Sequence, residues 1–153
     1  NNGTAARDLH ILNNLTVTAT ANYDCRFQAQ GANTHITIDG DIILDRNHTG
    51  IVEVFGIRLR YGSTMTANNM TVTYINSGDD NQEVYVRETS SLVLSGDVWL
   101  ECTGGNEEIS LDITDDAYCE CNNLTGLLAG GEAPSGIGWV IELLGHKVVR
   151  MLK

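Results

Sequence analysis

Arginines are scarce in this chain, and three of them stand near one tyrosine. The 153 residues include nine lysine and arginine residues, and the formal net charge is −11. Arg58 and Arg60 are two residues apart, and so are Tyr85 and Arg87. Because arginine forks bind carboxylates and a tyrosine ring can stack on a sugar, these four residues, with Asp112, are candidates for glycan contact.

The same residues could instead form a surface of salt bridges, or a face buried between subunits. Acidic partners for such bridges stand nearby at Glu53, Glu88 and Asp112.

Acidic pairs are the other possible source of chemistry. Glycoside hydrolysis needs two carboxylates roughly 5 to 10 Å apart. Adjacent acids occur at Asp79–Asp80, Glu107–Glu108 and Asp115–Asp116, all in expected loops or turns where charge is usually solvated. No nucleophile elbow, P-loop or HExxH motif is present. We therefore assign no catalytic residue, expect no cofactor, and favour a function without catalysis.

Metal binding has little support in the sequence. Ser77–Glu83 offers oxygen ligands for calcium, but the nonapeptide repeats of calcium-binding solenoids are missing. No CxxC motif occurs, and the histidines are scattered. Cys119 and Cys121 are two apart on an expected strand, so both should face one side as buried free thiols. We expect no metal site.

The charge and the hydropathy exclude some partners. A strongly acidic surface repels nucleic-acid phosphates and opposes docking on anionic lipid. No apolar run reaches the roughly 18 residues that cross a bilayer, so we expect no membrane insertion.

A repeated phrase dictates the architecture that must position these residues. "NNLT" at Asn13 returns as "NNMT" at Asn68 and as "NNLT" at Asn122, and "GDII" at Gly40 and "GDVW" at Gly96 stand between them. The five copies are spaced 27, 28, 28 and 26 residues apart. Apolar residues alternate on both sides of each copy, which predicts a strand, a sharp bend and a second strand. The bend residues, Asn-Asn, Ser-Gly-Asp and Asp-Gly-Asp, are tight-turn residues that tolerate positive φ angles.

A third strand precedes the later pairs, in "FGIRLRYG", "EVYVRE" and "EISLDIT". Three short strands in each repeat predict an all-β, right-handed parallel β-helix, or β-solenoid, of about five coils of about 27 residues. A jelly roll or sandwich also has many short strands, but antiparallel connections would not return one phrase at a constant interval.

The coil pattern resembles the parallel β-helix of pectate lyases and phage tailspikes. The resemblance covers roughly residues 8–128 and depends on asparagine at the short bend, at 13–14, 68–69 and 122–123. It implies a ladder of stacked, hydrogen-bonded asparagines, although Gly-Asp stands there on the coils between. In that family the outer face of the first strand of each coil lines a glycan groove, which implies a glycan role for Arg58, Arg60, Tyr85 and Arg87.

The two ends of the stack need cover, because open strand edges aggregate. We expect coils over residues 1–129, a linker over 130–136, and an apolar cap or oligomerisation segment over 137–153. That last segment fits either one helix or two strands, and its β-branched residues and central glycine favour strands. The first residues, "NNGTAARD", are too short and polar to form a cap. We therefore expect an upstream domain or a partner at that end.

Apolar residues on the outside suggest a homotrimer. Trp99 follows an inward valine, so it should point outward beside Ile43. With Trp139, Val140 and Ile141 of the last segment, these residues are candidates for a subunit interface.

The expected function is that of the distal domain of a phage tail fibre or tailspike, a rigid trimer that recognises a host surface polysaccharide. Its location would be the virion tail, outside the cell. The alternatives are a polysaccharide lyase or hydrolase of the pectate-lyase-like kind and a segment of a bacterial β-helical adhesin, secreted or on the cell surface.

Overall fold

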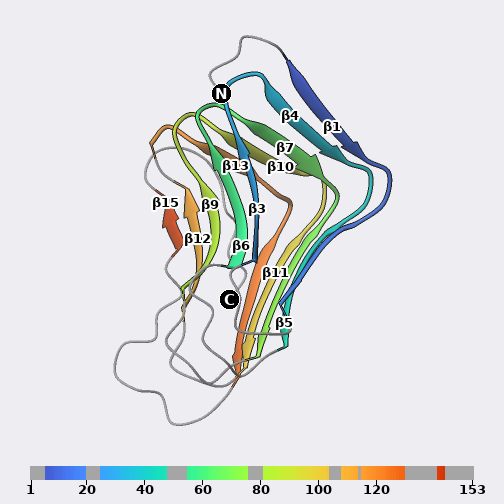
Figure 1. Cartoon of the computed structure of the whole chain (residues 1–153). Coiled ribbons are helices and arrows are strands. Elements are labelled where there is room, and N and C mark those ends of the chain that lie inside the picture. The colour runs from blue at the N-terminus through green and yellow to red at the C-terminus, as the bar shows by residue number, and fades with distance from the viewer. Residues whose placement is uncertain are drawn as a thin grey trace.

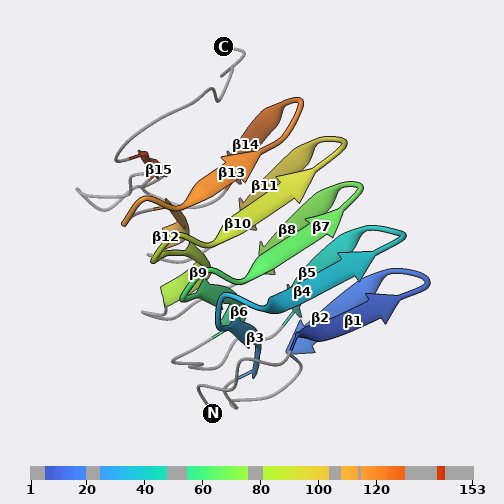
Figure 2. The same ribbon diagram turned by 90° about the horizontal axis from the view of Figure 1, so that it is seen from above.

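The chain folds as an all-β parallel solenoid. The computed structural model describes residues 6–19, 25–47, 55–75, 81–103, 108–113, 115–129 and 141–143. Within these residues there is no helix, and the strands form three parallel sheets of five strands each. The chain visits sheets A, B and C in that order on each coil. Figure 1 shows the sheets as sides of the coil, and Figure 2 shows the strands stacked in sequence order.

Each sheet takes one strand from every coil. Sheet A contains β1 (Arg7–Ile11), β4 (Thr34–Ile38), β7 (Thr64–Ala67), β10 (Ser91–Leu94) and β13 (Tyr118–Glu120). Sheet B contains β2 (Leu15–Ala19), β5 (Ile42–Asn47), β8 (Met70–Ile75), β11 (Val98–Thr103) and β14 (Leu124–Ala129). Sheet C contains β3 (Cys25–Gln30), β6 (Phe55–Arg60), β9 (Asn81–Val86), β12 (Glu108–Ile113) and β15 (Ile141–Leu143). The sequence pattern missed β3, whose inward residues are Phe27 and Ala29.

The core lies inside the coil, and period-two alternation fills it. Aliphatic side chains of successive coils stack in rows, such as Leu44, Val72 and Leu100, which are at most 2% exposed. Burial of this kind contributes roughly 25 cal/mol per Å² of apolar surface. The same alternation places Arg46 inside, where its side chain is fully buried.

The corner between sheets A and B carries a continuous polar ladder. Asn14 Oδ1 accepts from the Asp41 amide at 2.9 Å, and Asp41 Oδ1 accepts from Asn69 Nδ2 at 2.9 Å. Asn69 Oδ1 accepts from the Asp97 amide at 2.9 Å, and Asp97 Oδ1 accepts from Asn123 Nδ2 at 2.8 Å. Aspartate therefore takes the place of asparagine on alternate coils, and the ladder runs through the Gly-Asp coils.

Positive φ angles do not occur at this corner, although its residues tolerate them. Gly40 and Gly96 have no left-handed backbone. Left-handed residues occur at the corner between sheets C and A instead, where Tyr61, Glu88 and Asp115 have φ of 56°, 55° and 56°. The residue after each of them is left-handed as well.

The last segment is described only at β15, which pairs in parallel with β12 and so extends sheet C. The expected linker over 130–136 lies outside the described residues, as does the rest of 137–153. Among the described residues, no helix is long and apolar enough to cross a membrane.

Candidate glycan-contact site

The outer face of sheet C brings the candidate residues into one area. Arg58 of β6 pairs with Tyr85 of β9, and Tyr85 pairs with Asp112 of β12. Gln28 of β3 lies on the other side of Arg58. Because side chains of paired residues in a parallel sheet stack about 4.8 Å apart, Gln28, Arg58 and Tyr85 form a row across three coils. The side chain of Asp112 lies outside the part that can be described.

Two guanidinium groups cover the Tyr85 ring. Arg87 Cζ lies 3.9 Å from the ring centroid, and Arg58 Cζ lies 4.7 Å from it. Tyr85 is only 9% exposed as a residue. These are cation–π distances, so the tyrosine holds both arginines in place and has little ring surface for a sugar. Arg58 and Arg87, which are each partly exposed, therefore present more accessible surface on this face than the tyrosine does.

Arg58 retains unused hydrogen-bonding capacity. Its Nε is buried and has no hydrogen-bond partner in the described part of the chain. A buried donor without a partner is unfavourable, so this nitrogen would gain from an acceptor.

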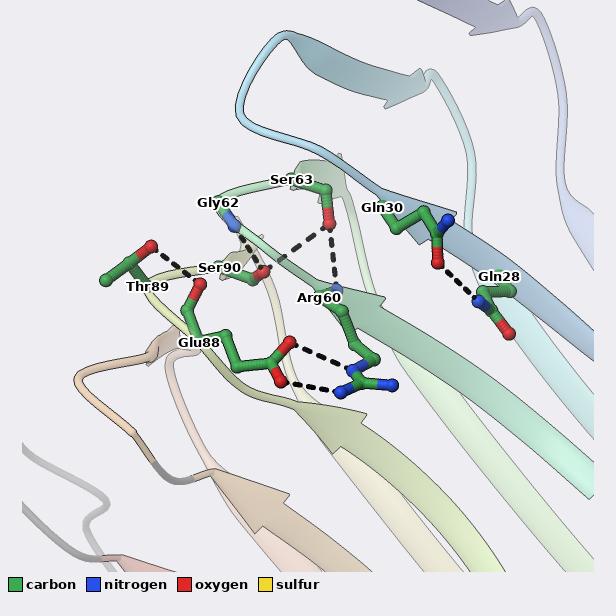
Figure 3. A network of polar contacts seen from close by, with 8 residues as sticks. All are labelled: Gln28, Gln30, Arg60, Gly62, Ser63, Glu88, Thr89 and Ser90. Atoms are coloured by element: carbon green, nitrogen blue, oxygen red, sulfur yellow. Dashed lines mark hydrogen bonds and ion pairs between the residues drawn. The ribbon is translucent and has the colours of Figure 1, made fainter. Parts of the chain in front are cut away.

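Arg60 differs from Arg58, because a carboxylate already neutralises it. Its Nε and Nη2 donate to the two carboxylate oxygens of Glu88, at 2.9 and 2.6 Å (Figure 3). This paired bond, aided by the charges of Arg60 and Arg58, lowers the pKa of Glu88. Arg60 also lies over the Tyr61 ring, at 4.6 Å. The salt-bridged alternative therefore holds for Arg60 and Glu88.

Two buried serines support the corner beside this ion pair. Ser63 Oγ accepts from the Arg60 amide at 3.1 Å and donates to the Ala29 carbonyl at 3.2 Å. Ser90 Oγ accepts from the Gly62 amide at 3.1 Å (Figure 3). Sequence analysis missed these residues, although both immediately precede a strand of sheet A at matching positions of their coils.

A second outward surface lies on sheet B. Trp99 is 38% exposed, and its Nε1 donates to Glu101 at 3.2 Å. The register places it in one row with the outward residues Thr16, Ile43, Thr71 and Thr125. The tryptophan is outward, as expected. Trp139 and Val140 lie outside the described residues, and so does the side chain of Ile141.

The thiols and acids form no second site in the part of the chain that is described. Cys119 and Cys121 are free and pack against the core together. Burial raises the pKa of Cys119 to about 12, so this thiol is protonated and unreactive at neutral pH. Over the described ranges, no three histidine, cysteine, aspartate or glutamate side chains gather to hold a metal ion. Asp115 and Asp116 are exposed turn residues, while Asp79–Asp80 and Glu107 lie outside these ranges.

Comparison with protein-family models, with curated proteins and with solved structures finds no match to this chain.

Proposed function

We propose that this chain is a distal domain of a phage tail fibre or tailspike, a homotrimeric rigid β-solenoid in the virion tail that recognises a host surface polysaccharide. The observation that supports it best is the separation of two outward surfaces. The row that contains Arg58 and Tyr85 lies on sheet C, and the exposed Trp99 lies beside Ile43 on sheet B. One face can then contact neighbouring subunits while another contacts a glycan.

The hydrogen bonds between coils and the stacked core make the solenoid a rigid scaffold for binding side chains. Each coil is hydrogen-bonded to the next along three sheets and at two corners. A rigid scaffold holds binding side chains in place, so less entropy is lost when a ligand binds.

Trimer formation is tested by the absolute mass in solution, from light scattering coupled to size exclusion. We expect about three times 16.6 kDa, and a lower mass for Trp99→Asp, since a charge there would be buried in the interface. Thr66→Asp, on the exposed outer face of sheet A, is the matched control and should keep the mass. A monomer for the unmodified chain would contradict the trimer.

Glycan recognition is tested by binding to a panel of neutral and carboxylated polysaccharides. We expect Arg58→Gln to weaken binding at least about tenfold, as for a lost charged hydrogen bond, and Arg7→Gln, on sheet A, to leave it unchanged. Binding to no polysaccharide would contradict the proposal. Release of shortened products would favour a lyase or hydrolase instead.

A further inference from the structure

The N-terminal end of the stack exposes the inside of the solenoid. Among the described strands, β1, β2 and β3 are the edge strands of their sheets, so each has a described neighbour on one side only (Figure 2). Leu9, whose paired partner Ile36 is buried, is 46% exposed, and Leu12 is 71% exposed. A hollow of about 330 Å³ opens between β1, β3 and β4, lined in part by Leu9, Phe27, Ala29 and Ile36. This end is a ready surface for a further strand layer.

The polar ladder specifies which kind of layer fits. On the middle coil, the Asn68 amide donates to the Gly40 carbonyl at 2.9 Å, and Asn68 Nδ2 donates to the Asp39 carbonyl at 2.8 Å. The Asn69 amide and Nδ2 both donate to Asp41 Oδ1, at 3.1 and 2.9 Å. All four donors therefore point toward the preceding coil.

Asn13 and Asn14 hold the same four donors at the end of the stack. Both residues are exposed, and these donors bond to no protein group in the described part of the chain. The acceptors they match are two backbone carbonyls and one carboxylate, in the arrangement of Asp39, Gly40 and Asp41.

We propose that the N-terminal face of the stack is a docking surface for one more parallel β-coil, which carries an aspartate at the corner above Asn14 and apolar inward residues above Leu9 and Phe27. This coil adds strands to β1, β2 and β3 and closes the hollow. The proposal is independent of glycan binding and of the trimer.

A second copy of this chain stacked end to end fits this surface less well. The last described corner between sheets A and B is Asn122–Asn123, and its Nδ2 atoms already donate to Ser95 and Asp97. Such a stack would bring Asn123 Oδ1 to Asn14, and the equivalent oxygens of Asn14 and Asn69 each accept one bond, from the next backbone amide. Asp41 Oδ1 accepts both the amide and the Nδ2 of Asn69, so a carboxylate satisfies this corner more completely. The alternation of asparagine and aspartate along the ladder therefore favours an acid-bearing coil.

The chain offers its own acid-bearing coil for the test. Asp8 and Thr64 both pair with His35, so they hold equivalent positions on successive coils. A second copy of residues 34–63 can therefore be placed before Asp8, with its last residue joined directly to Asp8, and the register is kept. The matched control carries the same copy with Asp41→Ala in the added coil only. Amide hydrogen exchange of Asn13 and Asn14 is measured by NMR in both proteins and in the unextended chain, with the solution mass recorded for each.

We expect the added coil to slow exchange at Asn14 by at least roughly tenfold, and the Asp41→Ala copy to lose most of that protection. The melting temperature should also rise by about 4 °C or more with the aspartate present. Equal exchange with the aspartate and alanine copies, or an added coil that leaves Asn13 and Asn14 unprotected in both, would overturn the proposal. The unextended chain could also self-associate in a way that is lost when the coil is added. That result would identify a second copy of the chain as the occupant of this face, and would overturn the proposal as well.

Discussion

Gly40 and Gly96 are required for space, not for a special backbone conformation. A Cβ built on Gly96 would clash with Asn69 Oδ1, and one built on Gly40 would clash with Asn14 Oδ1. In each case the asparagine of the preceding coil extends into the volume that glycine leaves open, where its Oδ1 accepts from the next amide, of Asp97 or Asp41. Glycine on one coil and asparagine on the coil before it are therefore a coupled pair.

The coupling predicts a non-additive stability effect. Gly96→Ala should lower the free energy of unfolding by about 1–3 kcal/mol, as for an overpacked site. In the Asn69→Ala background the two shortest contacts are gone and only the 3.1 Å approach to Asn68 O remains, so the same change should have a clearly smaller effect. Urea unfolding of the four proteins in this cycle measures the difference. Equal effects in the two backgrounds would refute the coupling.

The Arg60–Glu88 pair predicts a stability effect that depends on pH. The pKa of Glu88 is lowered from its ordinary value of 4.5 by the Arg60 hydrogen bonds. A lowered carboxylate pKa stabilises the fold above the ordinary value, and this contribution is lost as the pH falls through the folded-state value. The melting temperature of the unmodified chain should therefore exceed that of Glu88→Gln at neutral pH, and the difference should shrink below pH 4.5.

The control for this experiment is Arg60→Gln, which removes the cause of the shift. In that background, Glu88→Gln should change the melting temperature little at any pH. A difference between the unmodified chain and Glu88→Gln that stays constant from neutral to acidic pH would contradict the assignment.

At the scale of elements, three corners between sheets C and A, at 61–62, 88–89 and 115–116, contain two consecutive left-handed residues, whereas the first corner has a positive φ only at Gly31. Gly62, Thr89 and Asp116 hold the second place, with φ of 77°, 61° and 61°. The corners bond to one another, since the Gly62 amide donates to Glu88 O and the Thr89 amide donates to Asp115 O, both at 2.9 Å. Because a left-handed conformation costs about 1–2 kcal/mol for most residues and little for glycine, the threonine is the least suited residue here.

This corner predicts opposite effects for two exchanges of glycine. Thr89→Gly should raise the free energy of unfolding by up to about 1 kcal/mol, although it removes the hydroxyl bond to Glu88 O. Gly62→Ala should lower it by about 1–2 kcal/mol, because it adds left-handed strain and places a methyl group 3.2 Å from Ala32 Cα. Denaturant unfolding measures both changes, as shifts of the midpoint concentration when the slope (m-value) is the same for variant and unmodified chain. A loss of stability in Thr89→Gly would show that the corner is not strained.

In the described part of the molecule, the strands of each coil pair only with strands of the adjacent coils. Inward residues of the middle coils, such as Ile57, Met65 and Leu92, have no exposed surface, whereas Leu9 at the first coil is almost half exposed. In such one-dimensional folds, stability depends on contacts with adjacent coils, so the end coil opens more readily than the middle.

This architecture predicts a gradient of amide exchange along the axis. Protection should be highest in β7, β8 and β10, which have neighbours on both sides, and lowest in β1, which has one. Exchange followed by mass spectrometry of peptides measures it directly. Uniform protection across sheet A would indicate a single cooperative unit and contradict the nearest-neighbour description.

The sequence alone predicted the solenoid, because a bend that recurs at a nearly constant interval leaves the strands between bends no other regular pairing. It predicted the inward rows for the same reason, since period-two alternation assigns each residue of a strand to a face. The neighbourhood of Arg58 and Tyr85 and the outward Trp99 followed from that alternation. The glycan role and the trimer remain predictions.

Only the tertiary structure revealed what lies between coils. The partners of Asn69 are 27 or 28 residues away in sequence, so neither the aspartates in the ladder nor the space that Gly96 must leave could be inferred from local pattern. The left-handed corners were hidden because Tyr-Gly, Glu-Thr and Asp-Asp share no residue preference, and the stack imposes their conformation. The contacts of Arg60 and Tyr85 also lie between coils and could not be inferred from local pattern. Which acid neutralises the arginine, and which arginines cover the ring, depends on distances that exist only after the coils have stacked.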